Sequence, residues 1–352
     1  MDQSSVRIGK TIQQNMSIPN NPGLMHGSTG LSIFLYNLGK KNGNPEFIKT
    51  ADKILDTIFN NLEANVPLDF ENGLAGIGWG IEYLIQNNFV EGNPDEILED
   101  IDNKVFRILN EESITSFEIT NGLTGYLFYL IGRLKTISSP DSIAQRINKE
   151  LFILTINKIY DVVTPQFPYI VKEICFDITW RYAVLLRGLR DAFRLNIYNE
   201  KIICMIKQWL PNLEAYLPSM HINRLYLALV LKQIHSQIPD SRIERQIKIL
   251  MYGTDFGVVL NEVDPNQKCL RFGLPGFLII MNQAKYIMPL NYPNYTLLCE
   301  SYQVLLKEYL ESQMTIQLSD FKSEKTKFGL SEGIAGIGLL NLLLPELSVI
   351  GK

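Results

Sequence analysis

The feature that most constrains this chain is a short motif, two glycines three residues apart followed by an apolar segment, that occurs five times. The second glycines are Gly30, Gly76, Gly125, Gly276 and Gly336. Their intervals of 46, 49, 151 and 60 residues fit a unit of about 50 residues, the long interval being about three units. Such a period indicates stacked supersecondary units.

Two further copies are expected inside the long interval. Apolar runs without the glycines occur at both expected places, FDITWRYAVLLRGL from Phe176 and SMHINRLYLALVL from Ser219. Five clear copies and two degenerate ones predict seven units.

The segments between the motifs have the spacing of amphipathic helices, whereas those that follow the glycines are apolar on nearly every side. In 47–62, apolar residues recur at steps of three and four. A unit of about 50 residues accommodates two helices of about 15 residues, each roughly 22 Å long. We therefore predict an all-α fold, an α/α toroid of seven helical-hairpin repeats with inner and outer helix rings, formed by residues 1–352 as a single domain.

The repeated glycines are expected to serve the fold rather than a ligand. A glycine permits a sharp turn with positive φ and lets an inner helix begin close to its neighbour. Phosphate-binding glycine loops follow a β-strand, and strand patterns are scarce in this sequence.

Charge and cysteine patterns exclude several classes of protein. The 33 basic and 37 acidic residues give a net charge of −4 without a basic stripe, so no nucleic-acid partner is expected. The apolar run 333–345 is shorter than the about 20 residues of a membrane span, and 1–15 lacks the apolar stretch of a secretory signal. Four separated cysteines without a CxxC pair fit a reducing compartment. We expect a cytoplasmic protein with no transmembrane segment.

The motifs GLMHGSTG, ENGLAGIG and EGIAGIG, with the other glycine turns, resemble the lanthionine synthetase C-like family from Pro22 to Leu344. The resemblance implies a toroid of seven inner and seven outer helices and a role in modifying a ribosomally made peptide. Lantibiotic cyclases of this family add a cysteine thiolate of the peptide to a dehydrated serine or threonine, forming a thioether. Their central zinc ion, which makes the thiol a thiolate, is held by a fifth-repeat cysteine and a sixth-repeat Cys-His pair.

The zinc ligands that the resemblance implies are missing here. Met220 stands in place of the fifth-repeat cysteine, and Arg271 and Phe272 in place of the Cys-His pair. Neither a guanidinium nor a phenyl ring binds zinc, and a lone thioether is a poor ligand for it. We therefore predict no metal site and no zinc cofactor; a substitute site built from His221, Cys175 and Cys269 is the alternative.

Other residues near the turns are candidates for chemistry or binding. Glu118 matches the place of a third-repeat aspartate in the family, and Asp177 lies near that of a fourth-repeat histidine. Both carboxylates are candidates for general acid–base catalysis, with helix capping or solvation as the plain alternative. Further residues are predicted to line the central cavity: His26, Trp180, Arg181, His221 and Arg271.

Three functions remain open from the sequence. The first is a zinc-independent or non-catalytic protein, a pseudoenzyme, that binds a peptide or a peptide-modifying enzyme. The second is an active lanthipeptide cyclase with a non-standard site. The third is a carbohydrate-active toroid that uses paired carboxylates, drawn from Glu71, Glu118 and Asp177, with aromatic platforms at Trp79, Trp180 and Tyr126.

Overall fold

The computed structural model has helices as its only regular elements within the described part of the chain. The described residues are 3–15, 21–60, 66–135, 142–167, 175–262, 264, 267–313, 316–321 and 326–349.

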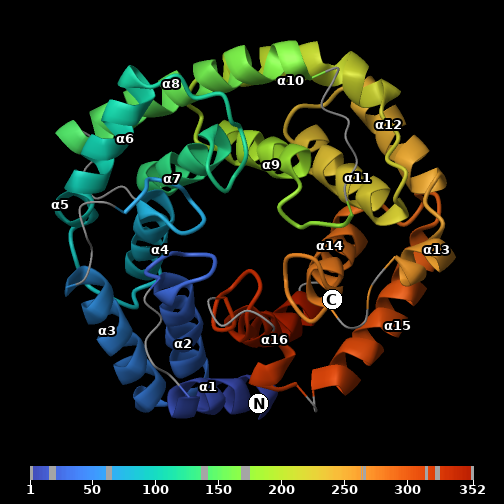
Figure 1. Cartoon of the computed structure of the whole chain (residues 1–352). Helices are drawn as coiled ribbons and strands as arrows, with labels where there is room; N and C mark the ends of the chain where they lie inside the picture. Colours follow the sequence, from blue (N-terminus) through green and yellow to red (C-terminus); the bar gives the residue numbers. More distant parts are fainter. Residues whose placement is uncertain are drawn as a thin grey trace.

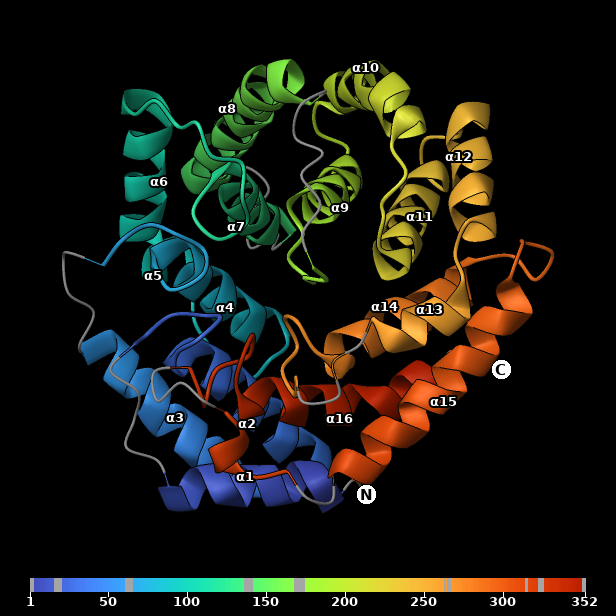
Figure 2. The same cartoon turned by 45° about the vertical axis from the view of Figure 1, so that its right-hand side comes forward.

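The helices form two concentric rings, seen end-on in Figure 1 and from a turned viewpoint in Figure 2. The inner ring consists of helices that each begin directly after a repeated turn. They are α2 (Ser28–Asn42), α4 (Leu74–Gln86), α7 (Leu123–Lys135), α9 (Arg181–Phe193), α11 (His221–His235), α14 (Leu274–Ile287) and α16 (Ile334–Val349).

More polar helices, which range from 4 residues in α5 to 24 in α8, surround the inner ring (Figure 1). They are α1 (Gln3–Asn15), α3 (Pro45–Asn60), α5 (Pro94–Ile97), α6 (Glu99–Glu111), α8 (Ile143–Gln166), α10 (Asn199–Ala215), α12 (Ser241–Tyr252), α13 (Phe256–Asn261) and α15 (Tyr295–Gln313). A 3-10 turn, η1 (Leu318–Asp320), follows α15. The all-α toroid predicted from the repeats is confirmed. Because the outer ring has extra short helices, the repeat count of seven stays a prediction.

The N-terminal helix closes the ring, which the sequence did not predict. Helix α1 packs against α16 and α2, burying Ile8 and Ile12 completely or nearly so. The Ser5 hydroxyl donates to the backbone oxygen of Gly338 at 3.2 Å. A segment from the start of the chain therefore supplies the outer partner of the last inner helix.

One ion network lies inside the wall of the ring. The side chain of Arg133, on α7, has no exposed surface and contacts Glu82 at 2.9 Å, Asp95 at 2.9 Å and Asp102 at 2.8 Å. Asp102 also accepts from the Tyr129 hydroxyl at 2.6 Å. Burial alone would lower the pKa of Arg133, but the hydrogen bonds and charge of Asp102 raise it above its usual value. The network ties α4, α5, α6 and α7 together.

None of the helices in the described residues is both long and apolar enough to cross a membrane.

Candidate functional site

The turns that precede the inner helices meet at one end of the toroid and are joined by backbone hydrogen bonds. In six of these turns, the residue that forms the hydrogen bond occupies the same position, three residues before the first residue of the helix. These residues are Met25, Glu71, Thr120, Ile178, Arg271 and Ser331. We call this chain of hydrogen bonds the turn belt.

The turn belt runs around the ring in a fixed order. The N–H of Glu71 donates to Thr120 at 3.2 Å, and that of Met25 donates to Glu71 at 2.8 Å. The N–H of Ser331 then donates to Met25 at 2.9 Å. The N–H of Arg271 donates to Ser331 at 3.0 Å. Finally, the N–H of Ile178 donates to Arg271 at 2.9 Å.

The turn before α11 does not belong to the turn belt. Its equivalent residue is Pro218, which has no N–H to donate. The turn before α9 therefore bonds directly to the turn before α14 through Ile178 and Arg271. The remaining acceptor, the carbonyl of Ile178, takes a hydrogen bond from the Tyr226 hydroxyl of α11 at 2.7 Å.

The motif glycines are needed for close packing, not for positive φ. Gly73 and Gly273, which precede α4 and α14, have φ of −107° and −108°. A Cβ on Gly273 would lie 1.9 Å from the oxygen of Gln267, and one on Gly276 would lie 2.1 Å from the oxygen of Leu270. The expectation of positive φ was wrong. Glycine is required at these positions because the turn folds back so tightly that it leaves no space for a side chain.

At the turn belt, Arg271 connects three carboxylates from different repeats. Its Nε lies 3.2 Å from Asp177, and its Nη1 lies 3.2 Å from Glu71 and 3.5 Å from Glu332. Glu71 is three hydrogen bonds away along the turn belt, so the guanidinium reaches across its interior. We call these four side chains, together with His26, the arginine hub.

His26 joins the arginine hub through Glu71. Its Nε2 lies 2.9 Å from the Glu71 carboxylate. Its Nδ1 is buried and has no hydrogen-bond partner among the described residues. The hydrogen bond to His26 lowers the pKa of Glu71 against the opposing effect of burial, and the charges of His26 and Arg271 lower it further. A carboxylate that orients an imidazole in this way is an arrangement suited to proton transfer.

Glu118 and Arg181 form a separate ion pair between the turns before α7 and α9. The Nε of Arg181 lies 3.3 Å from Glu118, and the two side chains are 38% and 36% exposed. The guanidinium also lies over the Phe117 ring, 5.7 Å from its centroid. Within the described residues, no backbone hydrogen bond links these two turns, so this ion pair spans the interruption of the turn belt.

The Glu118→Gln variant is expected to change the free energy of unfolding by about 0.5 kcal/mol or less, because a half-exposed ion pair contributes little. Urea unfolding of variant and wild type measures the difference. A loss above about 1.5 kcal/mol would show that the pair holds the two turns together more strongly than its exposure indicates.

The remaining predicted site residues lie outside the arginine hub. Trp180 is 3% exposed and packs among Tyr182, Tyr216 and Tyr226. His221, at the start of α11, accepts through Nδ1 from the backbone N–H of Asp255 at 2.8 Å. Of the seven predicted site residues, the structure brings together His26, Asp177 and Arg271, and separately Glu118 and Arg181.

The donor set does not fit a zinc ion. Pro218, three residues before the start of α11, occupies the place equivalent to Arg271, which lies three residues before α14. Met220, which the sequence placed at the zinc-binding cysteine, lies two residues later. Neither side chain holds zinc by itself. Among the described residues, no three His, Cys, Asp or Glu side chains are grouped so that they could hold a metal ion. Cys269 is buried and Cys175 is exposed; burial raises the pKa of the Cys269 thiol, which disfavours the thiolate.

Sequence reasoning did not assign Glu71 and Glu332 to one site. Glu71 was predicted only as a carboxylate of the carbohydrate-active alternative, and Glu332 was not among the predicted site residues. The sequence contained a pattern that could have indicated this site, because Glu71 and Arg271 lie two residues, and Glu332 one residue, before a motif glycine. Equivalent positions in a closed ring of repeats are brought to the same end.

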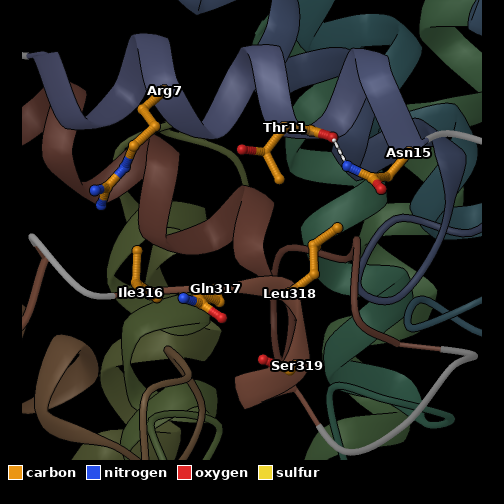
Figure 3. A pocket seen from close by; sticks show the side chains of 7 residues that line it. All are labelled: Arg7, Thr11, Asn15, Ile316, Gln317, Leu318 and Ser319. Atoms are coloured by element: carbon orange, nitrogen blue, oxygen red, sulfur yellow. Dashed lines mark hydrogen bonds between the residues drawn. The ribbon is translucent and has the colours of Figure 1, made fainter.

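A polar groove of about 460 Å³ lies away from the arginine hub, between α1 and the segment that contains η1 (Figure 3). Its lining residues are Arg7, Thr11, Asn15, Ile316, Gln317, Leu318 and Ser319. Arg7 donates to the backbone oxygen of Gln313, and the Asn15 amide donates to that of Thr11 at 2.8 Å. The groove belongs to the outer surface and contains none of the residues predicted from the sequence.

Comparison with known proteins supports the resemblance. Residues 18–170 match the family model described as lanthionine synthetase C-like protein. No curated protein sequence matches the chain. Among solved structures, nisin cyclase is similar over 97% of this chain and 93% of its own, with a TM-score of 0.66 and 13% identity. At that identity the structural likeness shows the fold, and the family match confirms the resemblance seen in the motifs.

Proposed function

We propose that this chain, a member of the lanthionine synthetase C-like family, binds a ribosomally made peptide, or the enzyme that modifies it, without zinc and without forming the thioether. The family match and the toroid shared with nisin cyclase support a role in lanthipeptide modification. The observation that carries the zinc-independent part is the ion pairing of Arg271 with Glu71, Asp177 and Glu332. By the resemblance, Arg271 and Phe272 stand at the positions of the Cys-His pair that holds zinc in the family's cyclases.

The surface around the arginine hub has the properties of a peptide-binding site. Phe272 is 39% exposed beside Arg271, whose guanidinium lies 4.8 Å from the centroid of the ring. Glu332 and Glu71 retain 31% and 23% side-chain exposure. An exposed aromatic ring next to half-exposed charges suits a peptide that offers apolar and basic side chains.

Isothermal titration with a lanthipeptide precursor, in full-length and dehydrated form, tests the proposal. We expect binding in the presence of EDTA and, by mass spectrometry, no protection of cysteine from alkylation when the dehydrated peptide is incubated with the protein. No binding at high micromolar peptide, or ring formation that requires zinc, would contradict the proposal.

The Phe272→Ala variant is expected to weaken peptide binding by about 5- to 30-fold, corresponding to about 1–2 kcal/mol for an aromatic contact residue. The melting temperature should change little, because the ring is exposed. The matched control is Tyr252→Ala at the end of outer helix α12, which removes a 79% exposed aromatic side chain that makes no contact with the arginine hub among the described residues. Equal affinities of the two variants would place the peptide elsewhere.

A second candidate, an active cyclase with a non-standard site, is favoured by the His26–Glu71 pair. An imidazole held by a carboxylate could accept the proton of a peptide thiol. Ring formation that persists in EDTA and is lost in His26→Ala would establish this candidate. Within the part of the chain that the structure describes, no contact favours the carbohydrate-active alternative, and Glu118 and Asp177 are each paired with an arginine.

A further inference from the structure

The arginine hub is a cluster of carboxylates gathered around a single cation, the guanidinium of Arg271. Three carboxylates converge from the turns before α4, α9 and α16, and the cation between them comes from the turn before α14. The side chains of Asp177, Glu71 and Glu332 are 9%, 23% and 31% exposed, and that of Arg271 is 22% exposed. Three partly buried carboxylates at such distances would repel one another without a cation among them.

We infer that the guanidinium of Arg271 is the resident cation of the toroid, a positioning residue that holds the three carboxylates and their turns in the place of a metal ion. This inference concerns how the hub is built and does not depend on whether a peptide binds.

The geometry of the guanidinium suits this role. Its planar donors point in fixed directions, so one group can bond several carboxylates at once. Nε is used for Asp177 and Nη1 for Glu71 and Glu332. The backbone of Arg271 is fixed as well, since its N–H bonds to Ser331 and its carbonyl accepts from Ile178. Side chain and main chain therefore both bind the turns before α9 and α16, and the side chain also reaches the turn before α4.

The charge of the group is permanent at physiological pH. Burial by itself lowers the pKa of Arg271, but the charges and hydrogen bonds of Asp177, Glu71 and Glu332 outweigh burial and raise it. His26 faces Glu71, and two further titratable groups adjoin the hub. Burial first, and then the charge of a hub carboxylate, raises the pKa of Cys269 beside Glu332 and of Tyr226 beside Asp177. Removal of Arg271 would leave three carboxylates and one imidazole.

The test is thermal unfolding of Arg271→Ala and wild type as a function of pH. At about pH 7.5 the variant should melt about 4–8 °C below wild type, and at about pH 4.5 the difference should fall to less than half, because protonation removes the repulsion. Ethylguanidinium chloride at millimolar concentration should restore at least half of the loss. Wild type should respond to neither ethylguanidinium nor EDTA.

Controls separate the resident cation from ordinary packing. Sodium chloride at equal ionic strength should not restore the melting temperature of Arg271→Ala. Arg181→Ala, which removes the half-exposed partner of Glu118, should show neither the pH dependence nor the rescue. If Arg271→Ala does not fold, Arg271→Lys replaces it, with a smaller loss of the same pH dependence, because an ammonium keeps the charge but not the planar donors.

Two results would overturn the inference. One is a loss in the Arg271 variant that is the same at both pH values and is not restored by ethylguanidinium. The other is a wild-type melting temperature that falls when EDTA is added.

Discussion

The Arg133→Met variant is expected to lose about 3–5 kcal/mol of folding free energy, because removing one partner of a buried ion network leaves uncompensated charge. Arg133 is completely buried and contacts Glu82, Asp95 and Asp102. Methionine retains much of the volume but none of the five donors. A loss of this size is a large fraction of the stability of most proteins, so reduced soluble yield is also expected. Urea unfolding followed by far-UV circular dichroism measures the effect.

The same substitution at Arg194 is the control. Arg194 pairs with Asp191 at 3.7 Å, but its side chain is 59% exposed, so Arg194→Met should cost about 0.5 kcal/mol or less. If the two variants unfold at the same urea concentration, the buried network contributes no more than a surface pair.

The Gly276→Ala variant is expected to lose at least about 3 kcal/mol, at the upper end of the range for overpacking, because the added methyl group meets backbone rather than a side chain. The new Cβ would lie 2.1 Å from the carbonyl oxygen of Leu270, the residue before Arg271. The turn must move to accommodate it, which would disturb the turn belt as well. Denaturant unfolding gives the loss of stability.

Gly188→Ala is the matched control, an identical change within another inner helix. There the added Cβ meets the terminal methyl group of Leu127 at 3.1 Å, which can move. Helix propensity favours alanine by up to about 1 kcal/mol, so this variant should stay within about 1 kcal/mol of wild type. A loss at Gly188 as large as that at Gly276 would refute the carbonyl contact as the cause.

The glycine repeats predicted the architecture because they mark a feature that recurs in the chain. Each clear motif is followed by an inner helix, and the two degenerate copies are followed by α9 and α11. In the glycine-free turns, the residues that precede the helices, Trp180 and Met220, have ψ of 116° and 132°. Gly73, before α4, has a ψ of −169° instead.

Other features could not be predicted because they depend on ring closure. Helix α1 was missed because its buried apolar residues, Ile8 and Ile12, are too few to mark a helix among polar neighbours. The contact between Arg271 and Glu71 joins residues 200 positions apart, and no local pattern determines such a pairing. Positive φ was predicted because glycine is known for that freedom, whereas the contact with a carbonyl six residues earlier is a property of the folded turn.

The interruption of the turn belt between the turns before α7 and α9 has a mechanical consequence. Widening this end of the toroid along the turn belt would rupture a main-chain hydrogen bond between turns. Between the turns before α7 and α9 it would instead break the Glu118–Arg181 ion pair and the contact of the Phe117 and Tyr182 rings. We therefore expect any opening of this end to begin at the turn ends of α7 and α9 rather than at the section crossed by Arg271.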